Sequence, residues 1–482
     1  MEILRAIFVC LEVVILFNVL IFVHELGHFL AARWRGLKVE RFAIWFGKPI
    51  WSRNLGGVEY ALGWIPAGGY VSLPQMAPMD AIEGSTSDVN AAPLPAISAM
   101  DKIIVAFAGP LFSFMLAFAF AFIVWGIGRP VGESEATTVV GNVYKGGPAE
   151  KAGLKPGDRI LEVDNKPVTK FGGGTGSSIV WRVVRSEGDT IPVKFERDGA
   201  IQTVQVEPVR LPTKAWQRKS LRQMQLEPAQ TPVIATVYTN SPAYAAGLKP
   251  LDQIVEVNGR KMVHFVQVGE AIAESGSQPV DLKVRRGEQE FRITVTPEKP
   301  LVPTDGKPML GIKWADGGRM TLAYPGPVEQ IRSSMTAMVD TIDAVISRKS
   351  NIGVQQLGGA VKILNTYYLL FQTEQGWRLA LWFSVLMNVN LAILNLLPFP
   401  ILDGGHIVLA IIEGIRRRPV SIKILQHLQS ACAMLLIGFM LFLTFFDVQE
   451  LGGSGRGGKD RQTELQFAPK SSHTVTIPKP LP

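Results

Sequence analysis

Long runs without charge constrain this chain more than any other feature of its sequence. Three runs contain no Asp, Glu, Lys or Arg: Ile103–Gly128, Leu379–Leu402 and Leu428–Phe446. Each is close to the ~20 residues that a helix needs to cross the hydrocarbon core of a bilayer. A fourth candidate is Ile3–Leu30, despite Arg5 and Glu12. We therefore predict a polytopic α-helical membrane protein with four transmembrane helices, in contact with membrane lipid.

Clusters of basic residues predict the orientation. Six Lys and Arg residues follow the first helix between positions 33 and 53, and Arg416–Arg418 follow the third. The positive-inside rule places both clusters in the cytoplasm, so residues 129–376 lie outside, as do both termini. The net charge of +8 is ordinary for a membrane protein, and we expect no nucleic acid partner. Cys10 and Cys432 lie in apolar stretches and predict no disulfide framework.

The outer segment contains an internal repeat. The stretch "VVGNVYKGGPAEKAGLKPGDRILEVDNKPV" from Val139 aligns without a gap, at an offset of 94, with "VIATVYTNSPAYAAGLKPLDQIVEVNGRKM" from Val233. In each copy a β run leads into a short helix that Gly153 or Gly247 ends, and a hairpin closes the copy. Both resemble PDZ domains, β-rich modules that bind peptides by adding a strand to a sheet edge. The alternative is a structural β-domain that binds nothing.

These patterns divide the chain into nine segments. We predict transmembrane helix 1 at 1–32, a cytoplasmic or re-entrant β region at 33–100, transmembrane helix 2 at 101–128, PDZ-like domains at 136–210 and 228–299, an amphipathic helical segment at 325–370, transmembrane helix 3 with the following loop at 378–406, transmembrane helix 4 at 426–447 and a disordered tail at 452–482. The amphipathic segment either lies on the outer membrane surface or packs on the repeats. The tail lacks periodicity, which is typical of disorder.

The first apolar stretch contains a costly polar motif, "HELGH". His24 and His28 are four residues apart, so they share one face of a helix and can bind one metal ion together. Glu25 can reach a water on that metal and take its proton, which makes it the candidate catalytic residue. Ionisable groups inside a membrane helix usually serve a function. The alternative is a pair of structural histidines that hydrogen-bond to their neighbours.

Zinc in a catalytic site needs a third protein ligand. The third helix runs from outside to inside, so its end, "NLAILNLLPFPILDGGH", lies at the depth of His24 and His28. Asp403 is the acidic residue there, and Pro398 and Pro400 break the helix before it. Irregular backbone at this depth must be buried in protein or line a polar cavity. We predict Asp403 as the third ligand, with His406 as a less favoured substitute.

These motifs, in combination with the tandem repeat, resemble the site-2 protease family of intramembrane zinc metalloproteases, specifically the RseP type with tandem PDZ domains. The resemblance covers the chain to about Phe446. It implies one Zn²⁺ per chain, held by His24, His28 and Asp403, with Glu25 as general base. It also implies a multi-pass protein of the bacterial inner membrane, with extracytoplasmic PDZ-like domains and the zinc site near the cytoplasmic side.

Further candidates contact the substrate. The Gly-rich stretch from Gly57 to Leu73 resembles a re-entrant β-loop of this family, and Gly68 and Gly69 within it are candidates for contacting an unwound substrate. A cytoplasmic hairpin without a substrate role is the alternative. The amides of Asn390 and Asn395 either bind the substrate and stabilise an oxyanion or join helices. We prefer Asn395, which is closer to Asp403.

The resulting hypothesis is an intramembrane zinc endopeptidase. The resemblance implies that it cleaves single-span transmembrane proteins, of the anti-sigma factor type or remnant signal peptides, after another protease has cut their outer part. The PDZ-like pair would filter substrates by size or bind peptide ligands. The alternative function is a non-catalytic membrane scaffold that recruits partners through that pair. One departure is "QQLGGAVKI", Gln355 to Ile363, where relatives often carry an Asn-Leu-Ser-Gly-Pro-type stretch.

Overall fold

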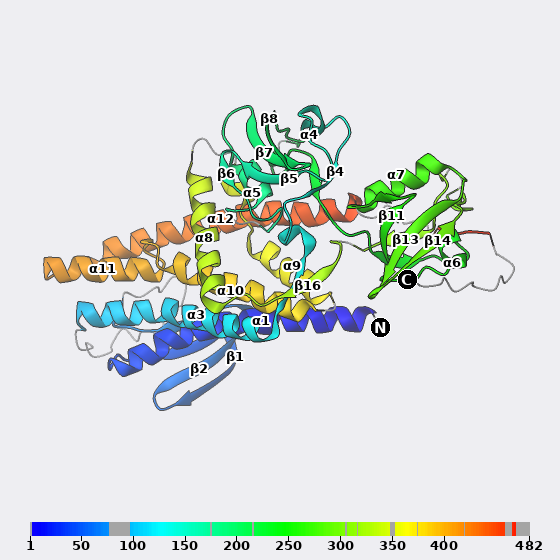
Figure 1. Ribbon diagram of the computed structural model, residues 1–482. Helices are drawn as coiled ribbons and strands as arrows, with labels where there is room; N and C mark the ends of the chain where they lie inside the picture. Colours follow the sequence, from blue (N-terminus) through cyan, green and yellow to red (C-terminus); the bar gives the residue numbers. More distant parts are fainter. Residues whose placement is uncertain are drawn as a thin grey trace. The chain divides into compact units, whose positions relative to one another are not determined.

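The computed structural model describes residues 2–76, 97–173, 176–214, 216–303, 306–315, 317–347, 352–373, 375–418, 420–457 and 465–468 (Figure 1). The chain forms two compact units. The first contains residues 1–129, 323–338 and 357–448, and the second contains residues 130–322, 339–356 and 449–482.

The first unit is mainly helical. Its helices are α1 (Glu2–Trp34), α3 (Ala99–Ile127), α9 (Ala360–Phe371), α10 (Gly376–Asn395), α11 (Asp403–Arg416) and most of α12 (Ile422–Gly457). Within the described residues, four helices are long and apolar enough to cross a membrane: Leu4–Trp34, Ala99–Ile127, Gly376–Asn395 and Ile424–Leu451. They coincide with the four runs found in the sequence. The chain is thus a multi-pass membrane protein, while the number of actual spans stays a prediction.

Helix α3 is the centre of this unit and contacts α1, α10 and α11. A capping box begins it, because Ser98 Oγ accepts a hydrogen bond from Asp101 N at 3.1 Å and Asp101 accepts one from Ser98 N. Small residues bring α1 and α3 close together. A methyl group on Gly27 would collide with the carbonyl oxygen of Ala108, so glycine is required at this crossing.

A β-hairpin follows α1, within the predicted β region. Its strands are β1 (Arg41–Leu55) and β2 (Val58–Ser72), and they pair antiparallel. The beginning of β1, Arg41–Ile44, pairs with both Glu59–Leu62 and Gly69–Ser72, so it lies between two parts of β2. Phe42 and Val71 join the buried cluster that also contains Phe29 of α1 and Val105 of α3. This cluster fixes the hairpin against the two helices.

The second unit contains the two copies of the repeat. The first repeat has the sheets β6-β5-β7-β8 and β4-β9 and the helices α4 (Pro148–Lys151) and α5 (Ile179–Arg185). Its strands are β4 (Val140–Val143), β5 (Arg159–Val163), β6 (Lys166–Pro167), β7 (Ile191–Arg197), β8 (Ala200–Val206) and β9 (Leu226–Pro228). β9 lies beyond residue 210, where the predicted domain ends, because a long connection separates it from β8.

The second repeat has the same arrangement. Its sheets are β12-β11-β13-β14 and β10-β15, and its helices are α6 (Pro242–Ala245) and α7 (Phe265–Ser275). Its strands are β10 (Ile234–Val237), β11 (Gln253–Val257), β12 (Arg260–Lys261), β13 (Val280–Arg286), β14 (Gln289–Val295) and β15 (Ile312–Trp314). β3 (Arg129–Gly132) pairs with β16 (Met320–Ala323) before and after the two copies.

Corresponding residues build the two cores. Val140, Leu154 and Ile160 are buried in the first repeat, and their partners at the offset of 94 are buried in the second. Each repeat also buries one aspartate that pairs with an arginine through two hydrogen bonds of 2.6 and 2.7 Å. These pairs are Asp158 with Arg197 and Asp252 with Arg286. The two copies therefore share their packing as well as their sequence pattern.

Two segments differ from the predicted boundaries. The helical segment 325–370 consists of α8 (Pro327–Ile346), a 3-10 turn at Val354–Gln356 and α9. In the tail from 452, helix α12 continues to Gly457, and Leu465–Ala468 lies against the second repeat. Helical backbone hydrogen bonds can continue past the last apolar residue, so composition alone misses this extension.

Candidate metal centre

The two histidines of the motif lie one turn apart in α1 and present their Nε2 atoms to the same point. The distance between His24 Nε2 and His28 Nε2 is 3.3 Å. The Nδ1 atom of His28 lies 2.8 Å from the carbonyl oxygen of Val105, which accepts a hydrogen bond but cannot donate one. In the neutral ring the hydrogen is therefore on Nδ1, and the lone pair of Nε2 is free to bind a metal ion.

Asp403, the first residue of α11, faces the two histidines. Its Oδ2 lies 3.3 Å from His24 Nε2, and its Oδ1 lies 3.4 Å from His28 Nε2. The turn before α11 folds back closely, since a methyl group on Gly404 would collide with the carbonyl oxygen of Leu396. The pair of glycines after Asp403 thus lets the chain bend so that the aspartate points at α1.

The three side chains fit a zinc ion. Bond lengths of about 2.0–2.2 Å around a tetrahedral zinc separate neighbouring ligand atoms by roughly 3.3–3.5 Å. The two Nε2 atoms lie 3.3 Å apart. His24 Nε2 lies 3.3 Å from Oδ2 of Asp403, and His28 Nε2 lies 3.4 Å from its Oδ1. Asp403 Oδ2 is buried and receives no well-oriented hydrogen bond from the described residues. Two nitrogen lone pairs and a carboxylate that converge in this way form a donor set for a cation.

Helix α3 supports the histidines, which the sequence did not predict. Ser113, fully buried, places its Oγ 2.9 Å from His24 Nδ1. A side chain on Gly109 would collide with the ring of His28, so this glycine makes room for the ligand. A serine and a Gly-Pro pair inside a charge-free run are the only sequence signals for this role. Such signals identify a partner only when the rotation of the helix is known.

A pocket of about 300 Å³ surrounds the three ligands. Glu25, Asn395 and His406 line it, as do Gly68 and Gly69 of β2, whereas Asn390 is not among the lining residues. The Nδ2 atom of Asn395 lies 3.2 Å from His24 Nε2. A methyl group on Gly69 would be 3.2 Å from Glu25 Cγ, so glycine lets β2 approach α1 closely there.

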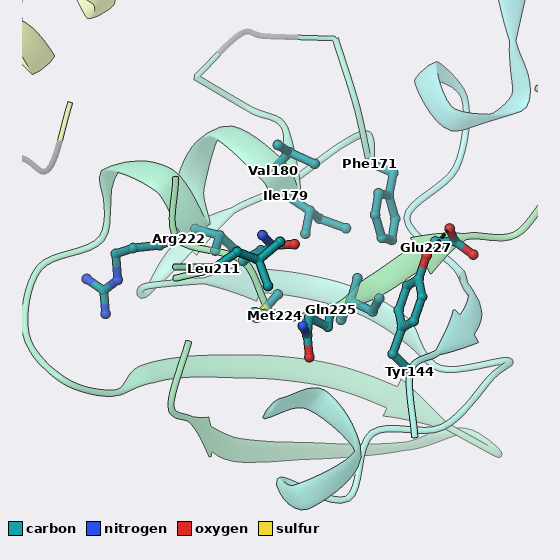
Figure 2. Close-up of a pocket in the computed structure, with 12 residues that line it drawn as sticks. Tyr144, Phe171, Ile179, Val180, Leu211, Arg222, Met224, Gln225 and Glu227 are labelled. Atoms are coloured by element: carbon teal, nitrogen blue, oxygen red, sulfur yellow. Dashed lines mark hydrogen bonds between the residues drawn. The ribbon is translucent and has the colours of Figure 1, made fainter. Parts of the chain in front are cut away.

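The first repeat has a groove of about 490 Å³ (Figure 2). Ile179 and Val180 of α5 line one side, and the segment from Gln223 to Glu227, which leads into β9, lines the other. Tyr144 donates a hydrogen bond of 2.6 Å to Glu227, which raises the pKa of the phenol. The guanidinium of Arg222 donates to the carbonyl oxygens of Ser186 and Gly188. The groove is therefore apolar in its middle, with charged groups along its wall.

Comparisons with known proteins match most of the chain. The family model "Peptidase family M50" matches residues 12–439. "Putative zinc metalloprotease PM1991" of Pasteurella multocida is 30% identical, over 90% of this chain and 97% of its own length. "Regulator of sigma-E protease RseP" of Salmonella typhimurium is 27% identical, over 90% of this chain and 97% of its own length.

Solved structures also match the chain, and one of them matches a short part of it. It is the PDZ domain of the SdrC-like protein Lin2157 from Listeria innocua, with 21% identity and a TM-score of 0.16. The similarity covers 18% of this chain and 93% of that one. The PDZ-like nature of the repeats therefore stays a prediction from their sequences.

Proposed function

Because the chain belongs to peptidase family M50, we propose that its pocket is the active site of an intramembrane protease. The chain is a zinc metalloendopeptidase and a multi-pass membrane protein. The proposal assigns these properties to particular residues. One observation carries it: His24, His28 and Asp403 offer three ligand atoms within 4.8 Å of one another.

In this proposal His24, His28 and Asp403 would hold one zinc ion. When bound, zinc lowers the pKa of a water ligand toward ~7 and polarises the scissile carbonyl. Val105 and Ser113 fix the two rings through Nδ1, so both Nε2 atoms point to the ion. His406 lines the same pocket but is not part of the cluster of three ligands.

Glu25 is the general base. It follows His24 directly in α1 and lines the pocket, so its carboxylate can take a proton from a water bound in that pocket. It takes a proton from this water as the oxygen attacks the scissile carbonyl. It then gives the proton to the nitrogen of the leaving amine. The two transfers leave the carboxylate in its starting form at the end of each cycle.

The C-terminal end of β2, residues Gly69–Ser72, holds the substrate. Gly69–Ser72 pairs with Arg41–Ile44 on one side, and three of its residues, Gly69, Tyr70 and Val71, line the pocket. An extended substrate can pair with the other edge of this strand, which replaces the hydrogen bonds lost when its helix unwinds. Gly69 leaves room beside Glu25, whereas a methyl group on Gly68 would collide with the ring of Phe46. Asn395 donates its amide hydrogen toward the carbonyl oxygen of the bound peptide.

The substrates are single-span membrane proteins of the anti-sigma factor type, or remnant signal peptides, after a first cut on the outer side. The name of the Salmonella relative, a regulator of sigma-E protease, supports this class. The protein lies in the bacterial inner membrane, with the repeats outside and the zinc near the cytoplasmic side, as the basic clusters indicate. The repeats filter substrates by size, and the groove in Figure 2 binds an extended peptide.

Cleavage of a co-expressed single-span substrate with a shortened outer part tests this function. The native chain is compared with Glu25→Gln, and Glu12→Gln serves as a matched control, since Glu12 lies in the same helix outside the pocket. We expect cleavage by the native and control chains and loss of at least about 100-fold in Glu25→Gln. Equal cleavage by all three chains would contradict the role of Glu25 and leave the scaffold alternative.

A further inference from the structure

A short segment of the C-terminal tail lies against the second repeat. Gln466 pairs antiparallel with Val302. The backbone nitrogen of Leu301 donates a hydrogen bond of 2.6 Å to the carbonyl oxygen of Gln466, and the nitrogen of Gln466 donates to Val302 at 3.3 Å. Phe467 is only 5% exposed. A segment of four residues cannot bury a phenylalanine by itself, so the surface beneath it does.

Gly311 forms the floor below the aromatic ring. A methyl group built on Gly311 would lie 2.7 and 2.9 Å from Cε2 and Cζ of Phe467, and it would also collide with Cβ of Ser241. Gly311 has a φ of +74°, in the left-handed region that favours glycine. Any side chain at this position would occupy the space of the ring. The absence of a side chain at Gly311 therefore leaves a site for the ring of Phe467 beside Gly311 and Ser241, which we call the seat.

In the first repeat, the side chain of Gln225 fills the position that corresponds to the seat. Gly147 corresponds to Ser241 at the offset of 94. Gln225 corresponds to Gly311, because each follows a buried residue whose carbonyl oxygen accepts a hydrogen bond from the short helix of its repeat, α4 or α6. Gln225 also has a positive φ, +57°. Its Oε1 lies 2.9 Å from the position of a methyl group on Gly147. The side chain of Gln225 thus lies where the second repeat leaves room.

We propose that the second repeat has a specific docking site for the chain's own segment Leu465–Ala468. Strand pairing with Leu301 and Val302 aligns the segment, and the aromatic ring in the seat formed by Gly311 and Ser241 selects it. The site takes an extended peptide with an aromatic residue directly after the paired one. The groove of the first repeat lies between α5 and β9, and Gln225, which corresponds to Gly311, is one of its lining residues.

The covalent connection makes this docking favourable. Residues 458–464 join Gly457 of α12 to Leu465. A short connection gives an effective concentration on the order of 1 mM for the tethered segment. A peptide added in solution must compete with this tethered copy. The native chain therefore binds added peptide weakly even when the site itself is intact.

A fluorescent peptide of residues 463–470, "TELQFAPK", tests the site on full-length chains in detergent. The variant Phe467→Ala vacates the seat, and we expect it to bind the peptide at least about ten-fold more tightly than the native chain does. A peptide carrying the same Phe→Ala change should bind roughly ten-fold more weakly or worse. The matched Gln466→Ala peptide should bind like the original, because Gln466 is exposed and pairs through its backbone.

A second variant blocks the seat. Ser241→Gly together with Gly311→Gln, made in the Phe467→Ala chain, gives the second repeat the residues of the first. Because Gln225 adopts the required backbone conformation in the first repeat, we expect the variant to fold and to lose peptide binding. The proposal is overturned if the Phe467→Ala chain fails to bind the peptide. It is also overturned if the folded double variant binds as well, or if the two altered peptides bind equally.

Discussion

Replacing Ser113 with alanine tests the role of α3 in the metal centre. The hydroxyl of Ser113 is fully buried, and its Oγ lies 2.9 Å from Nδ1 of His24. It fixes the ring so that Nε2 faces His28 and Asp403, each 3.3 Å away. Without it, the ring loses the Nδ1 partner that holds it among the described residues and can rotate. Zinc must then supply the free energy that orders the ligand.

The expected loss is about 10–100-fold in zinc affinity, as is usual when a hydrogen bond to a metal-bound histidine is removed. This corresponds to roughly 1.4–2.8 kcal/mol. The assay is competition for zinc between the purified chain and a chelator of known affinity. Cleavage of substrate at limiting zinc should decrease in parallel, and excess zinc should restore most of it.

Ser384→Ala is the matched control. Ser384 is equally buried, in α10, and its hydroxyl contacts Tyr367 and the carbonyl oxygen of Ala380 rather than a histidine. Both variants lose one buried hydroxyl, so effects on stability are similar. The argument that Ser113 orients His24 would be refuted if Ser113→Ala bound zinc as tightly as the native chain. It would also be refuted if both variants lost the same amount of zinc affinity.

Three further predictions follow from other sites. Asp403→Asn keeps the shape but removes the charge of one ligand, so bound zinc per chain should fall at least about ten-fold in metal analysis. Asp252→Ala breaks the buried pair with Arg286. Hydrogen exchange should show that it lowers the free energy of unfolding of the second repeat by roughly 2–3 kcal/mol. The control Asp281→Ala removes a more exposed carboxylate and should lower this free energy by less than about 1 kcal/mol. Burial lowers the pKa of His264 below its ordinary value of 6.5, so the unfolded state binds the proton first. The stability of the second repeat should be full above pH 6.5 and decrease as the pH falls below it, and His264→Asn, which keeps a helix cap, should reduce this dependence in thermal melts.

Patterns with a strong physical cause were predictable from the sequence. The three charge-free runs and the apolar stretch Ile3–Leu30 correspond to the four long helices, because apolar stretches of this length are typical of membrane-spanning helices. The repeat alignment predicted two copies of one fold, and their cores and buried Asp–Arg pairs correspond. The predicted orientation of the third helix places Asp403 at the depth of His24 and His28. In the structure the three side chains lie together.

Contacts that depend on how elements rotate and approach were not predictable. Ser113 and Gly109 support the histidines only because α3 turns that face toward α1, and no periodicity indicates this. β9 and β15 follow long connections after the hairpins β7–β8 and β13–β14. The predicted domains end after these hairpins, at residues 210 and 299, and therefore exclude both strands. The tail was predicted disordered from its composition, yet Phe467 is buried against Gly311. A single glycine on another element decides that contact, which composition cannot detect.

Bound zinc and cleavage, measured side by side on the purified Glu25→Gln chain, test the central claim most directly. If His24, His28 and Asp403 hold the metal and Glu25 only moves protons, this variant should contain one zinc ion per chain, like the native protein. Its cleavage of a single-span substrate should decrease at least about 100-fold. Cleavage at the native rate would remove Glu25 from the mechanism. If both the bound zinc and the cleavage activity are lost, Glu25 holds the metal instead.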